Sequence, residues 1–107
     1  MADDQLVDVT VTADDADWLA EFTRRLVNEK LAACGNLIPG VRSVYRWEGQ
    51  IHDDQQTLVI LHTRAALVPA IIERANAEHP DTTPQVIAVP VVDAHPGYQQ
   101  WVIDSTS

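Results

Sequence analysis

The fold is decided by residues 6–31, which read LVDVTVTADDADWLAEFTRRLVNEKL. At the start of this stretch, valines at every second position alternate with polar residues, a pattern typical of a strand with one buried face. The spacing then becomes helical, with apolar residues every three to four positions from Leu19 to Leu26. Aspartates near the start of the helical part and basic residues toward its end match the direction of the helix dipole. We therefore expect a strand at about 6–12, followed by a helix at about 14–31.

The remainder of the chain repeats this order of strand, helix and strand. The expected elements are a strand at about 34–48 that is interrupted near Pro39-Gly40, a turn at Gly49, a strand at 56–62, a helix at 67–78, a strand at 85–91 and a short helix at 97–103. Right-handed crossovers place both long helices on one face of a four-stranded sheet. This predicts an α+β fold of the ferredoxin-like split βαβ type, in the order βαββαβ with a short C-terminal helix. We expect a single domain over residues 1–107, with an ordered core at about 6–103.

Two features of the expected sheet indicate assembly. Its uncovered face should be polar, yet residues 58–61 and 86–89 are apolar at every position. The strand at 34–48 is roughly 14 residues long, against a usual length of about 5–6, and it carries Tyr45 and Trp47. One interpretation is that the hairpin bends back onto its own domain. The other, which we favour, is that the hairpin and the open face are buried against sister subunits in a trimer.

The composition favours an acidic globular protein. Of the 107 residues, 46% are hydrophobic and 21% are charged, and sixteen Asp and Glu against seven Lys and Arg leave a net charge of −9. Such a surface repels phosphate groups, so we expect neither nucleic acid nor a membrane as a partner. The acid excess fits either adaptation to high salt or an ordinary acidic cytoplasmic protein.

Sequence motifs exclude several classes of protein. Cys34 is the single cysteine, which rules out an intramolecular disulfide and a four-cysteine zinc site and fits a reducing compartment. Residues 1–5 lack the basic start of a signal peptide, and no stretch approaches the roughly 20 apolar residues of a membrane span. There is no dinucleotide fingerprint, P-loop, HExxH pair or GxSxG elbow. We therefore expect a cytoplasmic protein that is not an enzyme.

Three residues are candidates for metal or pocket chemistry. Cys34 either joins a histidine in a soft copper or zinc site or is a small buried hydrophobic side chain. His79 stands at a helix end, where it either meets the last carbonyls or acts as a ligand. His62 lies at a strand end, and it either pairs with a carboxylate or lines a pocket.

The long hairpin offers two further candidates. Tyr45 and Trp47 lie on the same side of one strand, and large aromatic side chains at such a place anchor an interface more often than they stack on a ligand. The segment His52-Asp53-Asp54 is either a cation site or a solvated hairpin corner. Adjacent side chains of a strand point to opposite faces, which favours the corner.

A set of residues spread over 7–103 carries a resemblance to a known family. Its members are Lys30-Leu31-Ala32-Ala33-Cys34, Asn36, Pro39, Ser43, Tyr45, Trp47, Gly49 and Ile51, then Thr63, His79-Pro80, Pro84, Pro90, Tyr98 and Trp101. With this set, the chain resembles the CutA divalent-cation tolerance family. The resemblance implies a ferredoxin-like subunit, a tightly packed homotrimer and a role linked to copper and other divalent metals, with no established enzymatic activity.

The chain departs from that family's pattern at several positions. The departures are His62 in place of a lysine, Asp81 in place of the tyrosine after His79-Pro80, and Gln85 in place of an acidic residue. Val11 and Glu78 stand where some members have a cysteine and a second histidine. Only His79 is left of the copper ligands that the resemblance implies. We therefore expect copper or another divalent cation to be bound weakly.

The resulting hypothesis is a non-enzymatic, CutA-like homotrimer linked to the response to copper or other divalent metal ions. Its expected metal ligand is His79, and Tyr45 and Trp47 are expected at the subunit interface. A pocket or intersubunit site is expected from Cys34, Trp47, His62, Gln85, Tyr98 and Trp101. The alternative is a small-molecule-binding trimeric sensor that resembles the nitrogen-regulatory signalling proteins. Those proteins hold anionic nucleotides with basic groups and Gly-rich loops, whereas this chain is acidic and poor in glycine.

Overall fold

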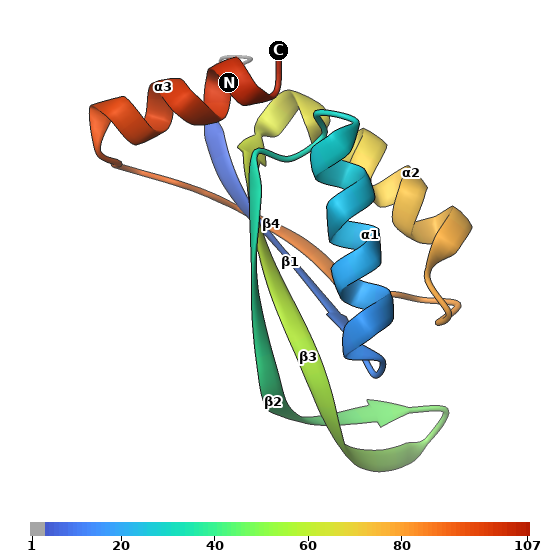
Figure 1. The fold of residues 1–107 in the computed structure, drawn as a ribbon. Coiled ribbons are helices and arrows are strands. Elements are labelled where there is room, and N and C mark those ends of the chain that lie inside the picture. The colour runs from blue at the N-terminus through green and yellow to red at the C-terminus, as the bar shows by residue number, and fades with distance from the viewer. Residues whose placement is uncertain (1–3) are drawn as a thin grey trace.

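The computed structural model describes residues 4–107, which form one antiparallel sheet of four strands, with three helices (Figure 1). The strand order across the sheet is β2-β3-β1-β4. This confirms the predicted α+β fold and the predicted order of elements. The elements are β1 (Leu6–Ala13), α1 (Ala16–Asn28), β2 (Cys34–Trp47), β3 (Gln50–Arg64), a 3-10 turn (Ala65–Leu67), α2 (Val68–Glu78), β4 (Val86–Pro90) and α3 (Pro96–Ser105). Residues 1–3 of the acidic N-terminal stretch lie outside the described part of the chain.

Helices α1 and α2 cover one face of the sheet, and the core lies between these helices and the sheet (Figure 1). Helix α1 begins at Asp15, whose carboxylate accepts from the backbone N–H groups of Asp17 and Trp18 at 2.9 and 3.1 Å. It ends three residues earlier than expected, before Lys30, whose φ of 63° is incompatible with a continuing helix. The largest fully buried apolar side chains of this face are Val9, Val11, Leu19, Phe22, Leu26, Val59, Leu61 and Ile71.

Gly35 allows α1 to lie close to β2. A Cβ atom at this position would come within 2.4 Å of the Thr23 methyl carbon and 3.1 Å of a Val59 methyl carbon. Thr23 is held in that place because its hydroxyl donates to the carbonyl of Leu19 at 2.8 Å. A residue with a side chain at 35 would therefore push the helix away from the sheet.

The long hairpin differs from its prediction mainly at β3, which begins at Gln50 and not near residue 56, and which ends at Arg64 and not at 62. The paired segment continues to the turn because Trp47 and Gln50 still face each other. The two residues between them, Glu48 and Gly49, have φ values of 50° and 78°. Positive φ at both central positions is the geometry of a tight hairpin turn whose twist matches that of the strands.

The hairpin bends at Pro39-Gly40, where the register of β2 and β3 shifts, and its end extends below α1 (Figure 1). Gln56 donates from this bent part to the Asp14 carboxylate at 2.9 Å. Apolar side chains of the hairpin nevertheless stay exposed, with Val44 at 66% and Ile51 at 62% of their full exposure. Exposed apolar side chains also lie on the uncovered face of the sheet, at Ile38, Ile87 and Val89.

Helix α3 lies across the end of the sheet where β1 begins and β3 ends (Figure 1). Val102 is fully buried and packs with Leu6 and Ala33 in a small second core. The guanidinium of Arg64 donates to the hydroxyl and carbonyl oxygens of Thr106 at 2.8 and 2.6 Å. These contacts fix α3 beside the sheet, where its aromatic side chains reach the uncovered face.

Candidate functional site

Three polar side chains lie in one row across the uncovered face of the sheet. In the strand register, His62 of β3 faces Asp8 of β1 on one side and Cys34 of β2 on the other. Residues directly opposite each other in antiparallel strands project from the same face, with Cβ atoms about 5 Å apart. The pairing of the strands therefore brings an acid, an imidazole and a thiol together.

His62 is the centre of this row. Its Nδ1 lies 2.7 Å from Asp8 Oδ1, and its Nε2 lies 2.8 Å from Asn36 Oδ1. Asn36 stands two residues after Cys34 and therefore on the same face of β2. The side chains of His62 and Asp8 retain 22% and 32% of their exposure, so the pair is screened from water but reachable. Of the two alternatives for His62, the structure shows the pairing with a carboxylate, and that carboxylate is Asp8.

Helix α3 adds two aromatic rings to the row. The Tyr98 and His62 rings lie nearly perpendicular, with 6.0 Å between their centroids, and the centroid of the Trp101 ring lies 5.4 Å from that of Tyr98. Burial raises the pKa of the Tyr98 hydroxyl, and the nearby Cys34 and Asp8 raise it further. The helix that carries these rings is capped by His95, whose Nδ1 accepts from the backbone N–H of Gly97 at 3.0 Å.

We call Asp8, Cys34, Asn36, His62, Tyr98 and Trp101 the open-face cluster. Four of them, Cys34, His62, Tyr98 and Trp101, were predicted as site residues, and the structure brings these four together. Asp8 and Asn36 were not predicted as site residues. The period-2 alternation of the first strand places Asp8 on the polar side, which is the signal that would have found it. Asn36 shares its face with Cys34 for the same reason.

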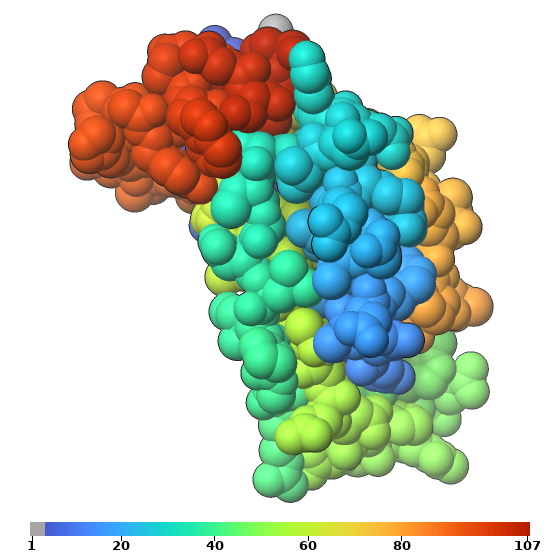
Figure 2. Space-filling view, viewed as in Figure 1, coloured from blue at the N-terminus to red at the C-terminus, as the bar shows by residue number. Residues whose placement is uncertain are grey.

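Trp101 also lines a groove along the edge of the sheet, between α1 and β2. Its apolar lining includes Ala20, Val27 and Leu37, and Cys34 lies at the end near α3. Figure 2 shows this edge of the molecule, with β2 running between α3 and α1. Cys34 is only partly buried, so the cysteine is not a fully buried hydrophobic residue.

Trp47 and Gln85 are not brought to the open-face cluster within one chain. Trp47 stands at the far end of the hairpin and keeps 43% of its exposure. Gln85 is exposed just before β4. Tyr45, near Trp47, donates to the Asp54 carboxylate at 2.5 Å, and this bond raises the pKa of Tyr45 to about 12.

The segment His52-Asp53-Asp54 does not gather its side chains around a common point. Asp53 forms a two-pronged ion pair with Arg42, at 2.8 and 2.7 Å, which lowers the pKa of Asp53. Asp54 accepts from Tyr45, and the His52 ring stacks on Tyr45 with 5.1 Å between centroids. These contacts are those of a hairpin corner.

The contacts of His79 do not fit the expected metal-ligand role. Its Nε2 lies 2.8 Å from the carbonyl oxygen of Thr12, to which it must donate. Its Nδ1 accepts from the backbone N–H of Asp81 at 2.9 Å, which uses the lone pair that a metal ion would need. The side chain is buried, at 1% exposure, and its ring packs nearly perpendicular to that of Trp18. His79 thus joins the end of α2 to β1 through both ring nitrogens, and neither nitrogen meets the last carbonyls of α2.

The described residues do not supply a complete metal site within one chain. Over residues 4–107, no three His, Cys, Asp or Glu side chains are grouped so that they could hold a metal ion. Tight sites use three or four well-placed ligands. The residues present therefore do not fit a tightly bound metal in the single chain.

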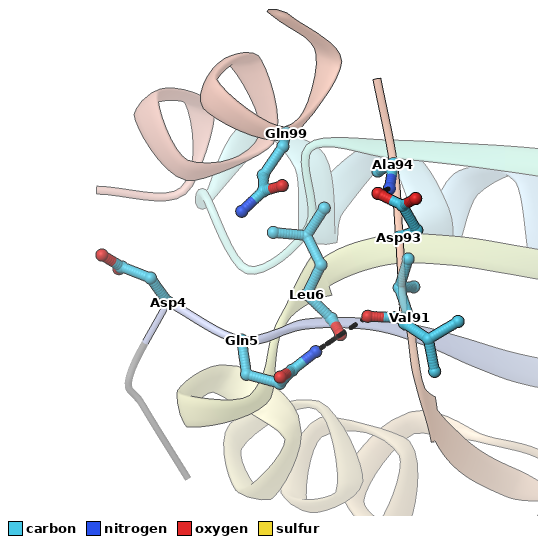
Figure 3. Close-up of a pocket in the computed structure, with 8 residues that line it drawn as sticks. Asp4, Gln5, Leu6, Val91, Asp93, Ala94 and Gln99 are labelled. Atoms are coloured by element: carbon cyan, nitrogen blue, oxygen red, sulfur yellow. Dashed lines mark hydrogen bonds between the residues drawn. The ribbon is translucent and has the colours of Figure 1, made fainter. Parts of the chain in front are cut away.

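A second hollow, of about 170 Å³, lies between the start of β1, the segment before α3, and α3 itself (Figure 3). Its polar lining includes Asp4, Asp93 and Gln99. Gln5 crosses its floor and donates to the carbonyl of Val91 at 3.0 Å (Figure 3). This bond ties the segment before α3 to β1, so we interpret the hollow as part of the attachment of α3.

Comparison with known proteins gives consistent results. The family described as "CutA1 divalent ion tolerance protein" matches residues 7–105. The chain is 35% identical to the divalent-cation tolerance protein CutA of Thermus thermophilus, over 92% of this chain and 95% of that protein. It is 39% identical to the chloroplastic protein CutA of Arabidopsis thaliana, over 92% of this chain but 54% of that protein. The crystal structure of CutA1 from Oryza sativa superposes with a TM-score of 0.92, at 36% identity, over 96% of this chain and 94% of that one. In residues 4–107, no helix is long and apolar enough to cross a membrane.

Proposed function

The chain belongs to the CutA1 divalent ion tolerance family, and on that premise we propose that it acts as a homotrimer in the tolerance of copper and other divalent metals. We propose that it does so without catalysing a reaction and in the cytoplasm. The single cysteine supports a reducing compartment. The absence of the common catalytic motifs supports a non-enzymatic role.

The observation that carries the proposal of a trimer is the set of exposed apolar side chains. Val44, Tyr45, Trp47 and Ile51 on the hairpin, and Ile87 and Val89 on β4, keep between 39% and 66% of their exposure. β2 and β4 are also the two edges of the sheet. A ring of three copies joins unlike surfaces and closes, so it covers both edges of every copy.

In this proposal, the open-face cluster is an intersubunit site. Cys34, His62, Tyr98 and Trp101 come from one copy, and Trp47 and Gln85 reach the site from neighbouring copies. Support comes from their positions in the single chain, where Trp47 and Gln85 are exposed and remote from the cluster. Cys34 and His62 offer a thiolate and an imidazole, which suit copper and zinc. Because one chain does not group three such ligands, we expect metal binding to be weak unless a neighbouring copy contributes a donor.

Native mass spectrometry of protein purified without chelators tests the assembly. We expect a single species of three times 11.8 kDa at micromolar concentration. Trp47→Ala should weaken the assembly by about 2–4 kcal/mol if the indole is a central anchor. The exposed helix residue Arg24 gives a matched control, since Arg24→Ala should leave the mass unchanged. A stable monomer of the unchanged protein would contradict the proposal.

Titration calorimetry with copper tests the metal link. We expect binding no stronger than that of a partly exposed histidine such as His52, and we expect Cys34→Ser to weaken what binding there is. His79→Ala should not change the copper affinity, because both ring nitrogens of His79 already have backbone partners. Tight binding with a whole-number stoichiometry that Cys34→Ser abolishes would contradict weak binding and establish an intersubunit centre.

A second candidate is a trimeric sensor of a small organic molecule. Tyr98 and Trp101, which keep 40% and 45% of their exposure beside a polar row, favour it. The same mass spectra separate the two functions. A co-purified organic mass lost in Trp101→Ala would support the sensor, and a metal adduct would support the tolerance role.

A further inference from the structure

We propose that residues 41–56, the outer half of the hairpin, form a rigid arm that is hinged at Pro39-Gly40 and held in place by one hydrogen bond, from Gln56 to Asp14. We call this segment the hairpin arm. It has two positions, one docked beneath the start of α1 as in Figure 1 and one released. The device lies within one chain, so it depends neither on metal binding nor on assembly.

The hinge is a β-bulge between the sheet and the arm. Two residues of β2, Pro39 and Gly40, lie opposite the single residue Thr57 of β3. Proline has no N–H group to pair across the strands, and a Cβ atom at Gly40 would have no atom within 4 Å. Thr57 is also the last residue of β3 that pairs with β1, opposite Ala13. Beyond this level, residues 41–47 and 50–56 pair only with each other.

The arm holds its own shape through contacts between its two strands. Arg42 and Asp53 form a two-pronged ion pair across the strands, at 2.8 and 2.7 Å. Tyr45 donates to the Asp54 carboxylate and stacks on the His52 ring. Because these contacts lie entirely inside residues 41–56, they survive when the arm moves. The arm therefore moves as one piece.

The attachment of the arm to the rest of the domain is slight by comparison. None of residues 41–56 is buried, so the arm contributes no side chain to either core. Within residues 4–107, the one hydrogen bond that joins an arm side chain to another part of the chain runs from Gln56 to Asp14, at 2.9 Å. A unit with so few buried contacts separates from its domain at a low cost in free energy.

The two sides of the arm differ in exposure. The half-buried residues alternate along both strands and share the side that faces the domain; they are Val41, Ser43, His52, Asp54 and Gln56. By the same alternation, Tyr45 and Trp47 lie on this side. Val44 and Ile51 lie on the opposite, exposed side. Release of the arm would therefore uncover the side that carries the two large aromatic rings.

Like charges oppose the docked position. The hydrogen bond to Asp54 has the largest effect in raising the pKa of Tyr45, burial raises it further, and the charges of Asp14 and Asp81 add to it. The carboxylates of Asp14, before α1, and Asp81, after α2, thus lie near the arm, which carries Asp54. Salt screens repulsion between exposed charges. One hydrogen bond therefore competes with a repulsion that weakens as the salt concentration rises.

The movement has a consequence for the proposed trimer. Trp47 lies near the end of the arm, and the proposed function places its indole in the open-face cluster of a neighbouring copy. The position of the arm would then set how far the indole reaches. This consequence rests on the proposed function, whereas the hinge itself does not.

Distances between two spin labels test the hinge. Labels at Arg46→Cys on the arm and Ala77→Cys on α2, in a Cys34→Ser background, report the position of the arm. Dilution with unlabelled protein restricts the measurement to pairs within one chain. We expect Gln56→Glu, which places a second carboxylate beside Asp14, to add a released population that molar potassium chloride reduces.

Two further variants sharpen this test. In Gln56→Ala, the ratio of docked to released arm should fall about fivefold, the factor for the loss of one net hydrogen bond. Gln55→Glu is the matched control, because it adds the same charge to the same strand on the exposed side, opposite Arg42. We expect this control to give the distances of the parent protein.

Three results would overturn the proposal. One is a single distance distribution shared by the parent protein, Gln56→Glu and Gln56→Ala, and another is an equal change in Gln55→Glu. The third is a loss of hydrogen-exchange protection in residues 41–56 of Gln56→Glu, since the arm would then unfold and not swing. If Gln56→Glu does not fold, Gln56→Ala and the control decide the question. A monomer in native mass spectra would contradict the proposed trimer, while the distances would still decide the hinge.

Discussion

At the scale of single residues, His79 contributes stability through two hydrogen bonds and not through a metal ion. It joins the carbonyl of Thr12 in β1 to the backbone of Asp81 after α2. His79→Ala leaves a buried carbonyl without a donor, so we expect a loss of about 1–3 kcal/mol in the free energy of unfolding. Urea denaturation checks this, with His52→Ala, at a half-buried position of the hairpin, as the control. An unchanged midpoint for His79→Ala would mean that these bonds do not stabilise the fold.

The same residue shows where reasoning from sequence alone fails. The helix end before Pro80 was correctly identified, but the His79 ring bonds the carbonyl of Thr12 in β1 and not the last carbonyls of α2. Which atoms meet the ring depends on the packing of β1 beside α2, and these elements are far apart in the sequence. For His62 the local pattern indicated the strand end, but its partners come from β1 and β2. Local periodicity predicts which face a side chain occupies, whereas its partners depend on strand order and register.

At the scale of elements, the distance between α1 and β2 depends on the absence of a side chain at Gly35. A Cβ there would lie 2.4 Å from the Thr23 methyl carbon, so Gly35→Ala should destabilise the protein by about 1–3 kcal/mol. Thr23→Ser removes that methyl group and keeps the hydroxyl that bonds Leu19. We expect the double variant to recover part of the loss in thermal unfolding. If the loss of stability in the double variant equals the sum of the losses in Gly35→Ala and Thr23→Ser, then the contact with the Thr23 methyl group does not cause the destabilisation.

The two long helices are joined by a chain of charges. Glu78 accepts from Arg25 at 2.7 Å and from Arg74 at 2.5 Å, and Arg74 also reaches Glu29. The hydrogen bond from Arg74 lowers the pKa of Glu78, with a smaller contribution from Arg25 that is opposed by burial. A carboxyl group whose pKa is lowered by folding stabilises the fold fully when the pH is above its ordinary, unfolded-state pKa. This contribution is lost as the pH falls through the folded-state pKa.

Glu78→Gln should therefore lower the free energy of unfolding at neutral pH by about 1 kcal/mol, the scale of a partly exposed ion pair. The difference from the parent protein should shrink as the pH falls below the ordinary value of 4.5 and disappear only below the lowered folded-state pKa, where both proteins carry a neutral side chain at 78. Urea midpoints measured at several pH values check this. A difference that persists in acid would point to packing and not to charge. Glu21→Gln, which alters an exposed pair with Arg24, is the matched control.

The elements themselves followed well from the sequence, and the exceptions have physical causes. Alternation and helical spacing predicted the strands and helices in their correct order. The start of β3 was placed late because residues 52–56 are all polar, so no apolar alternation follows Ile51. They form a strand because they pair with β2 across a tight turn, an interaction that composition does not record.

At the scale of the whole molecule, the charge distribution predicts a dependence on salt. Each chain carries a formal charge of −9, so three copies would bring −27 together. Salt shortens the screening length from about 10 Å at 0.1 M to about 3 Å at 1 M. We therefore expect both the melting temperature and the strength of assembly to rise with potassium chloride. An unchanged melting temperature between low and molar salt would contradict self-repulsion as a significant cost to this fold.

The tight turn at Glu48-Gly49 has a kinetic consequence. Contacts between β2 and β3 link residues that are close in the chain, so the hairpin can close before the distant partners β1 and β4 meet. Gly49 has a φ of 78°, which alanine adopts only with strain. If the hairpin forms in the rate-limiting step, Gly49→Ala will slow refolding and leave unfolding nearly unchanged. Val86→Ala in β4 will instead mainly speed unfolding. Stopped-flow measurements at several protein concentrations would separate these steps from association, and they would show whether the chain folds outward from the hairpin.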